Sequence, residues 1–184
     1  MKRKFERSLI ASGFGGQGLM VLGQIVAYAG MHDGRNVTWI PSYGPEMRGG
    51  TANCSVIVSE DQIGSPVVPE ADYVVVMNQP SLTKFEPRVK SGGVLFYNSN
   101  LIKYEKPRED IKIYPIPVNS IANELGNDKV ANIVMLGALV TTGDIVSEES
   151  ALEMLDEKLG KKKPDFIPVN RCAFQKGKEI VISG

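Results

Sequence analysis

The chain has 184 residues, of which 42% are hydrophobic and 23% are charged, a composition that fits one globular domain and excludes disordered and fibrous chains. Lysine plus arginine and aspartate plus glutamate each number 21, so no net charge attracts nucleic acid or an anionic membrane. No apolar stretch approaches the roughly 20 residues of a membrane span, and the apolar run at residues 9–12 is too short for a signal-peptide core. We therefore expect a cytoplasmic protein that binds neither nucleic acid nor membrane.

Two cysteines, Cys54 and Cys172, and a single histidine, His32, limit the metal and catalytic chemistry of this chain. Without a Cys-x-x-Cys pair the chain alone offers no ligand set for an iron–sulfur cluster or a structural zinc. We expect free, partly buried thiols, with one bridge between the distant cysteines as the alternative. His32 falls at the end of a predicted helix, where we expect a surface residue, so no Ser-His-Asp set and no catalytic residue is predicted.

A strand, a glycine turn, a helix and a second strand are predicted in order near the N-terminus. Residues 8–11 form a short apolar run, residues 19–30 repeat apolar side chains at helical spacing, and residues 36–40 are β-branched and aromatic. Because a helix between two strands usually makes them parallel neighbours, we expect these two strands to pair. Residues 54–58 predict a further strand.

The middle of the chain predicts a second strand-helix-strand unit. Residues 72–77 form a continuous apolar run, typical of a strand covered on both faces at the centre of a sheet. Pro80 can begin a short helix before a strand at residues 94–97. Residues 111–118 look extended, and their two prolines favour the edge of the sheet.

The last third of the chain predicts two helices and an extended tail. Residues 131–140 are apolar on nearly every side, so we expect a helix partly buried in an interface with another chain, with an intradomain core helix as the alternative. Ser147 is a good N-cap for a helix that ends at Gly160, and residues 169–182 look extended. The whole chain, residues 1–184, then predicts one α/β domain in a three-layer, Rossmann-like arrangement, with a mostly parallel sheet and helices on both faces.

The glycine turn after the first strand is the first candidate site. It satisfies the G-x-G-x-x-G spacing between a strand and a helix, where backbone N–H groups and the helix N-terminus favour an anion. A dinucleotide site also needs an acidic residue after the second strand, whereas Pro41 and Ser42 follow Ile40. NAD or FAD is therefore disfavoured, and close strand–helix packing is the alternative role of the glycines. The candidate binding residues are Gly13, Gly15, Gly16, Gln17 and Gly18.

A second candidate site is the polar loop that follows the second predicted strand. Open α/β sheets bind ligands at the carboxyl ends of their strands. Arg48, beside Gly49 and Gly50, can present a planar fork to a carboxylate or a phosphate. Tyr43 and Glu46 complete the candidate residues, and Glu46 would orient Arg48 or pair with a neighbouring subunit. A surface turn with a local ion pair is the alternative.

Four stretches together carry a family resemblance: GFGGQG at 13–18, YGPEMRGG at 43–50, ADYVVVMN at 71–78 and NIVMLGAL at 132–139. In this order they resemble the gamma subunit of 2-oxoacid:ferredoxin oxidoreductases over nearly the whole chain. The 43–50 loop is more similar to the 2-oxoglutarate or branched-chain 2-oxoacid type than to the pyruvate type.

The resemblance implies a subunit of an enzyme that converts a 2-oxoacid and coenzyme A to acyl-CoA, carbon dioxide and reduced ferredoxin. Thiamine diphosphate with Mg and the iron–sulfur clusters would belong to alpha and beta subunits or a ferredoxin-like delta subunit, with none bound by this chain alone. The chain would complete the complex and shape the approach to the active site on the coenzyme A side. Gly15 to Gly18 would form the loop at the carboxyl edge of the sheet, and Arg48, Gly49 and Gly50 would face the shared cavity.

Two other functions stay open at this point. A free-standing nucleotide-binding or regulatory module could share the fold, because fold alone does not determine function. A gamma-like subunit of a related indolepyruvate enzyme would keep the reaction class and change only the substrate, whose choice we expect to reside in partner chains.

Overall fold

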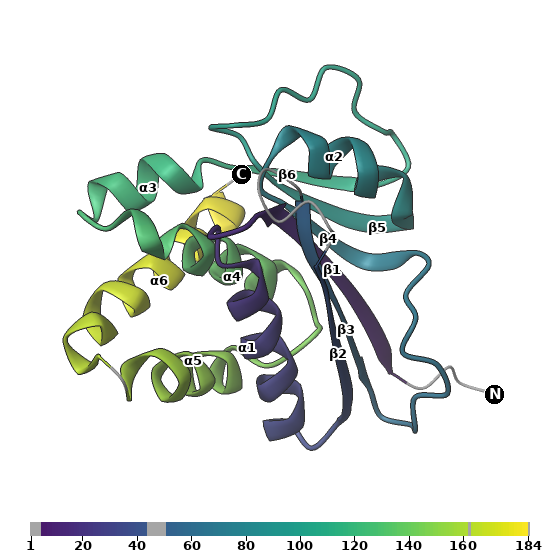
Figure 1. The fold of residues 1–184 in the computed structure, drawn as a ribbon, viewed down its shortest axis with the longest axis horizontal. Helices are drawn as coiled ribbons and strands as arrows, with labels where there is room; N and C mark the ends of the chain where they lie inside the picture. The colour runs from purple at the N-terminus through teal and green to yellow at the C-terminus, as the bar shows by residue number, and fades with distance from the viewer. Residues whose placement is uncertain (1–4, 44–50, 162, 184) are drawn as a thin grey trace.

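The computed structural model describes residues 5–43, 51–161 and 163–183, with the side chain of Tyr43 excluded. A six-stranded sheet in the order β2-β3-β1-β4-β5-β6 lies at its centre (Figure 1). The strands are β1 (Glu6–Phe14), β2 (Asn36–Tyr43), β3 (Thr51–Ser59), β4 (Ala71–Val76), β5 (Val89–Asn98) and β6 (Lys112–Ile116). The α-helices are α1 (Leu19–His32), α2 (Gln79–Phe85), α3 (Val118–Glu124), α4 (Ala131–Thr142), α5 (Glu148–Leu155) and α6 (Ile167–Ser183).

Strand direction confirms the predicted mostly parallel sheet and corrects one predicted pairing. β1, β4, β5 and β6 pair in parallel, and β3 alone runs against its neighbours β1 and β2. The first two strands were expected to pair with each other, but β3 lies between them and pairs with β1 from Glu6↔Ser59 to Phe14↔Thr51. The reason is that β2 and β3 form an antiparallel pair that enters the sheet as one unit.

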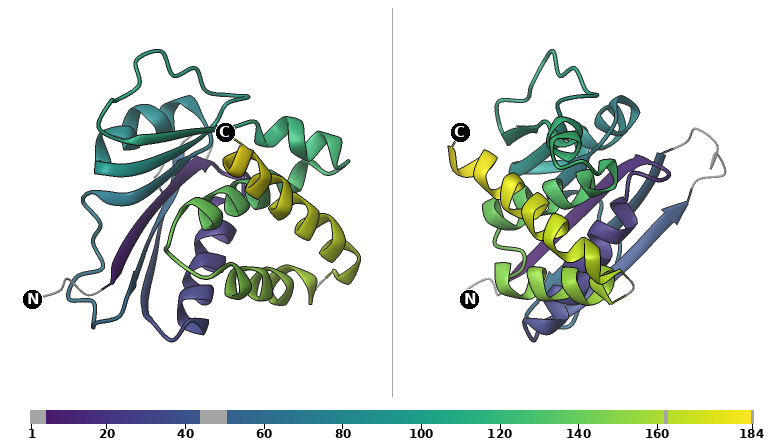
Figure 2. Two further views of the ribbon diagram at one scale, coloured as in Figure 1. Left: turned by 180° about the vertical axis from the view of Figure 1, so that it is seen from behind. Right: turned by 90° about the vertical axis from the view of Figure 1, so that its left-hand side faces the viewer.

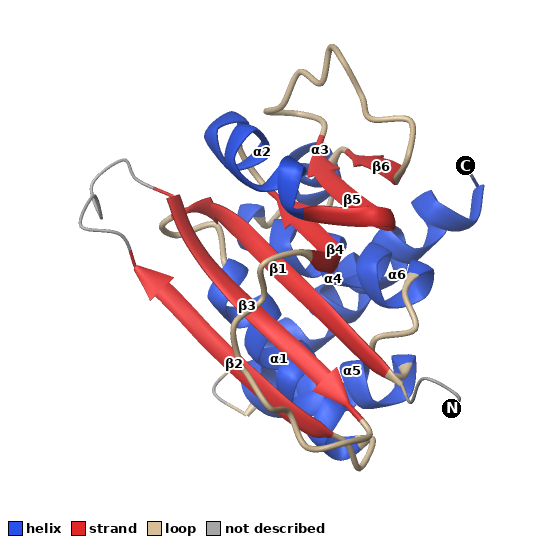
Figure 3. Cartoon of the chain, turned by 90° about the vertical axis from the view of Figure 1, so that its right-hand side faces the viewer, coloured by secondary structure: helices blue, strands red, loops and turns tan. Residues whose placement is uncertain are grey.

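Helices cover both faces of the sheet, as predicted, but unequally. α1, α4, α5 and α6 lie on one face and α2 lies on the other (Figures 2 and 3). The larger core is packed between the sheet and the first group of helices, and the smaller core gathers Ile10, Val74 and Leu95 under Leu82 and Phe85 of α2. No helix in the described part of the chain is long and apolar enough to cross a membrane.

Several elements lie where the sequence predicts them. β4 is central, between β1 and β5, and β6, which contains Pro115, is an edge strand. α2 carries proline in its first turn, and the Asn78 side chain caps it by accepting from the Ser81 N–H. Ser147 caps α5, which continues through a π-helical turn to Gly160. His32 lies exposed at the end of α1, as predicted. Both cysteines are free, as predicted, but neither is partly buried, because Cys54 is fully buried and Cys172 is exposed.

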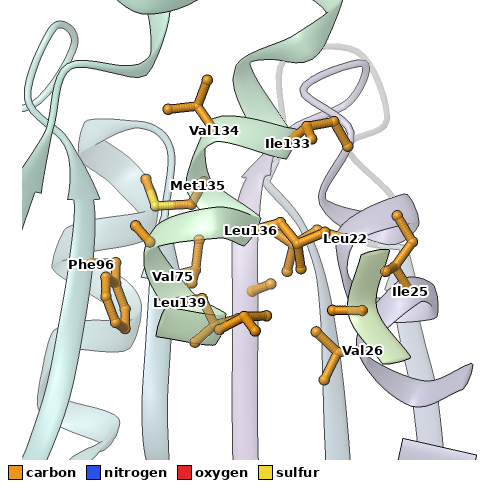
Figure 4. Close-up of a cluster of buried hydrophobic side chains, with 14 of the residues drawn as sticks. Leu22, Ile25, Val26, Val75, Phe96, Ile133, Val134, Met135, Leu136 and Leu139 are labelled. Atoms are coloured by element: carbon orange, nitrogen blue, oxygen red, sulfur yellow. The ribbon is translucent and has the colours of Figure 1, made fainter. Parts of the chain in front are cut away.

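The apolar helix α4 is a core helix of this chain, so its predicted partial burial in a subunit interface is wrong. Every residue from Ala131 to Val140 is buried within the chain. In Figure 4 Met135 and Leu136 of α4 lie among side chains that include Leu22 of α1 and Phe96 of β5. The apolar surface of α4 is therefore covered by α6, α3 and α1 and, in the larger core, by the sheet.

The predicted extended tail at residues 169–182 is also wrong, because this segment is the helix α6. Its packing against α4 depends on two glycines that let the helix backbones meet. A Cβ atom on Gly177 would lie 1.8 Å from the Val134 carbonyl oxygen, and one on Gly137 would lie 2.0 Å from the Phe174 carbonyl oxygen. Tertiary packing thus overrides the β-propensity of the Ile180–Ile182 run.

Candidate functional site

The glycine loop connects the carboxyl end of β1 to the first turn of α1, and its glycines have different physical roles. Gly16 and Gly18 have φ of 93° and 77°, a conformation that favours glycine, and Gly18 is the N-cap of α1. At Gly13 a Cβ atom would lie 2.6 Å from the Gln17 Oε1 and 3.0 Å from the Met77 Cβ. Gly15 has open space around it. The pattern therefore serves both the turn and close packing.

Gln17 ties the glycine loop to the neighbouring strand β4. Its Oε1 accepts hydrogen bonds from the Phe14 N–H at 2.7 Å and from the Asn78 Nδ2 at 3.4 Å. Its Nε2 donates to the Met77 carbonyl oxygen at 3.3 Å. The side chain thus sets the shape of the loop.

A row of asparagine side chains continues this network across the carboxyl ends of the parallel strands. The Asn98 Nδ2, at the end of β5, donates to the Met77 carbonyl oxygen at 3.4 Å and to the Asn119 Oδ1 at 2.7 Å. Asn78 and Asn98 are both buried. Asn78 and Asn98 are not among the site residues predicted from the sequence, although each directly follows an apolar strand run and that position was the available signal.

A pocket of about 460 Å³ opens beside the glycine loop, within the ~300–1,000 Å³ usual for small-molecule sites. Residues from the loop, the end of β4 and the starts of α4 and α6 line it, among them Gly16, Gln17, Gly18, Met77, Asn119, Asn127, Lys129, Asn132, Lys163 and Phe166. It lies where the helices after β1 and β4 leave on opposite faces of the sheet, the usual ligand position in such folds.

Two helix ends and two lysines bring positive potential to the pocket, whose lining also includes one exposed carboxylate, Asp128. The amino ends of α1 and α4 both meet it through Gly18 and Ala131, and helix amino ends carry positive potential and free N–H groups. Lys129 and Lys163 are exposed residues of the lining. The arrangement suits a ligand that is anionic at one end.

Asn132 connects the amino end of α4 to the amino end of α1. It is 6% exposed, and its Nδ2 donates to the Gly18 carbonyl oxygen at 3.0 Å. A Cβ atom on Gly18 would lie 2.4 Å from that same Nδ2. The tight fit explains the need for glycine at position 18 beyond its backbone angle. Asn132 is a further site residue that is not among those predicted from the sequence.

The second predicted loop meets the same edge of the sheet through its two ends. Tyr43 is the last residue of β2 and pairs with Ala52, while Thr51 begins β3 and pairs with Phe14. Both ends therefore lie beside the glycine loop. Glu46, Arg48, Gly49 and Gly50 lie outside the described residues, so their roles stay predictions.

A cluster of side chains with shifted pKa values lies at the opposite, amino edge of the parallel strands. Asp144 accepts from the Arg7 Nε and from the Tyr73 hydroxyl, each at 2.6 Å, and the Arg7 hydrogen bond lowers the pKa of Asp144 to about 2. Burial and the Asp144 hydrogen bond raise the pKa of Tyr73 to about 12. This cluster joins β1, β4 and the end of α4 and is remote from the pocket. Among the described residues no group of His, Cys, Asp and Glu is arranged to hold a metal ion.

Named relatives match most of this chain. It is 40% identical over 166 residues to the ketoisovalerate oxidoreductase subunit VorA of Methanothermobacter marburgensis, covering 90% of this chain and 34% of that protein. It is 36% identical over 180 residues to the 2-oxoglutarate synthase subunit KorC of Methanocaldococcus jannaschii, covering 96% and 95%. The chain thus spans about a third of the length of VorA but nearly all of KorC.

Solved structures give the same assignment and share the fold. The keto/oxoacid ferredoxin oxidoreductase gamma subunit of Geobacter sulfurreducens has a TM-score of 0.84 at 33% identity, covering 97% of this chain and 99% of its own. The 2-oxoglutarate:ferredoxin oxidoreductase of Magnetococcus marinus, solved with 2-oxoglutarate, coenzyme A and succinyl-CoA bound, has a TM-score of 0.89 at 27% identity, covering 100% and 32%. The predicted resemblance is confirmed: because the family profile described as pyruvate ferredoxin/flavodoxin oxidoreductase matches residues 8–180, the chain belongs to this family, with gamma subunits of 2-oxoacid:ferredoxin oxidoreductases among its relatives.

Proposed function

We propose that this chain is the gamma subunit of an enzyme that oxidatively decarboxylates a 2-oxoacid with coenzyme A, giving acyl-CoA, carbon dioxide and reduced ferredoxin. The observation that carries this proposal is the carboxyl-edge pocket, in a chain whose relatives include 2-oxoglutarate and ketoisovalerate enzymes. We assign the decarboxylation chemistry of thiamine diphosphate with Mg, and the electron transfer of the iron–sulfur clusters, to alpha, beta and ferredoxin-like delta subunits.

In this proposal the pocket binds part of coenzyme A and so shapes the approach to the shared active site. Coenzyme A is anionic at its phosphates and largely neutral along its pantetheine arm. The amino ends of α1 and α4 with Lys129 and Lys163 favour the phosphates, and the apolar lining from Met77 and Phe166 favours the neutral part. Arg48 is proposed as a further anion contact from the second loop.

In this proposal some residues of the chain bind the anion and others position the binding groups. Gly16 and Gly18 allow backbone N–H groups to approach an anion, and the lysines neutralise its charge. Gln17 and Asn132 are positioning residues, because they hold the loop and the start of α4 in place through hydrogen bonds to backbone groups. The substrate is proposed to be 2-oxoglutarate or a branched-chain 2-oxoacid.

The test is steady-state kinetics of the assembled enzyme, prepared anaerobically with all its subunits. Lys129→Ala, Lys163→Ala and Arg48→Ala are each expected to raise KM for coenzyme A about tenfold with kcat nearly unchanged, since a charge-assisted hydrogen bond contributes about 1.5 kcal/mol or more. Lys176→Ala is the matched control, because Lys176 is exposed on α6 and pairs with Glu179. Unchanged kinetics in all three variants would contradict the assignment of the pocket to coenzyme A.

Purification distinguishes this function from its rival. Native mass spectrometry of material captured anaerobically through this chain should show larger chains together with thiamine diphosphate and iron. A lone chain without these cofactors that binds a nucleotide in calorimetry would instead indicate a free-standing nucleotide-binding module. Maximal turnover with indolepyruvate would keep the reaction and change the substrate.

A further inference from the structure

On the face opposite α1, one part of the sheet surface is covered by no helix of residues 5–43, 51–161 and 163–183. Val37 and Trp39 of β2 pack against the larger core, so the alternate residues of β2 point to the other face. The register places Ile40 opposite Ser55 and Ser42 opposite Asn53, and Phe14 opposite Thr51. We call the area formed by Phe14, Ile40, Ser42, Thr51, Asn53 and Ser55 the outer sheet patch.

The described chain covers only the surroundings of this patch. α2 packs on β1 and β4, where the Ser12 and Ser81 hydroxyls lie 2.9 Å apart. The connection from β3 to β4 passes in front of the sheet (Figure 3) and packs Val68 in the same small core as Ile57. Beyond these two elements, Phe14 and Ile40 are each 39% exposed.

The neighbouring strands β2 and β3 lack the charges that protect exposed sheet surface. No residue of β2 or β3 is Asp, Glu, Lys or Arg, although 23% of the chain is charged and each of the other four strands carries at least one such residue. Edge strands such as β2 usually carry charged side chains in monomers, whereas the cores of protein interfaces are depleted of them. The absence of charge therefore favours a protein partner over water.

The relatives indicate which partner this is. In VorA of M. marburgensis and in the M. marinus enzyme the matching unit is about a third of a longer chain, whereas in KorC of M. jannaschii and the G. sulfurreducens gamma subunit it is nearly the whole chain. A unit that occurs both joined and separate needs a surface that fits the remainder of the protein without a covalent link.

We propose that the outer sheet patch docks a larger subunit of the same enzyme through an uncharged surface of aliphatic, hydroxyl and amide groups. This inference rests on the proposed function and adds the place of contact. Pro41 lacks the N–H that strand addition along β2 would use, so the contact is made by the face of the sheet. Because Phe14 also begins the glycine loop, the docked subunit lies next to the coenzyme A pocket.

The experiment measures the affinity between this chain and the larger subunits, co-expressed and purified anaerobically and then separated. Ile40→Lys and Ser42→Lys place a charge in the patch, and each is expected to weaken assembly at least tenfold. Met31→Lys is the matched control, since Met31 is 59% exposed on α1 in the opposite layer, and it should change the affinity less than twofold. Ile40→Leu should assemble like the wild type. Thermal unfolding of each variant checks that the chain is folded, and Ser42, which is exposed, gives a variant that leaves the core intact.

Each outcome has a definite meaning. Wild-type affinity in both folded patch variants would overturn the docking surface and leave the proposed function standing. A wild-type chain that does not assemble with the larger subunits at all would contradict the proposed function itself. A wild-type homodimer that Ile40→Lys dissociates, without loss of binding to the larger subunits, would assign the patch to a second copy and overturn the proposal.

Discussion

The contact between α4 and α6 predicts that Gly177→Ala destabilises the fold, against the normal effect of this substitution. In an unobstructed helix alanine is more favourable than glycine by about 1 kcal/mol. Here the added Cβ atom would lie 1.8 Å from the Val134 carbonyl oxygen and 3.1 Å from the Ala138 backbone nitrogen. Because both are backbone atoms of a buried helix, the clash is relieved only by moving α6 away from α4, and overpacking of this kind costs about 3 kcal/mol. The expected net loss of stability is about 2 kcal/mol.

Urea unfolding measures this loss in the free energy of unfolding. It can be followed by circular dichroism and by the fluorescence of Trp39, the single tryptophan. With a denaturant dependence of about 2 kcal/mol per molar urea, the midpoint should fall by about 1 M. Gln175→Ala, on the exposed side of the same helix, should shift it by less than a quarter of that. A Gly177→Ala protein as stable as the wild type, or more stable, would refute the close packing of these helices.

Three further predictions concern other parts of the chain. Asp144→Asn should lower the free energy of unfolding by up to about 1 kcal/mol at pH 7. The pKa of Asp144 is lowered from 3.8 to about 2, so its ionised form stabilises the fold and is lost as the pH falls. Unfolding curves of variant and wild type should therefore converge between pH 4 and pH 2. Cys172 should react with a thiol reagent at once and Cys54 only on unfolding, since Cys54 is buried and burial raises the pKa of its thiol to about 12; equal rates in the native protein would contradict this. Asn132→Ala should cost about 1 kcal/mol by removing the hydrogen bond to the Gly18 carbonyl oxygen, whereas Asn123→Ala, an exposed change in α3, should be neutral in the same unfolding assay.

The sequence predicts elements whose signals are local. Three confirmed features can each be read from residues that are neighbours in the sequence: the continuous apolar run of β4, the capping serine of α5 and the glycine turn after β1. The edge position of β6 follows from its proline in the same way. Such features need no knowledge of what lies across the core.

The features that the sequence analysis mispredicted depend on contacts between distant residues. α6 ends in a β-branched run that favours a strand, and it is helical because Gly177 meets α4. α4 itself has no polar face, a pattern that does not distinguish burial by another chain from burial by its own. Asn78, Asn98 and Asn132 are ordinary polar residues in the sequence, and only the fold brings the first two to one strand edge and the third to the glycine loop.

The insertion of β3 explains how two loops that are far apart in the sequence come to the same edge. β2 runs in the same direction as β1, so its carboxyl end, at Tyr43, lies at the edge where β1 ends at Phe14. β3 then returns between them, which places Thr51 directly opposite Phe14. Had β2 paired directly with β1, the chain leaving Tyr43 would have no antiparallel partner to fix the far end of the second loop. The intervening strand thus holds both ends of that loop beside the glycine turn, and the same arrangement exposes the uncharged face that we propose to dock the larger subunit.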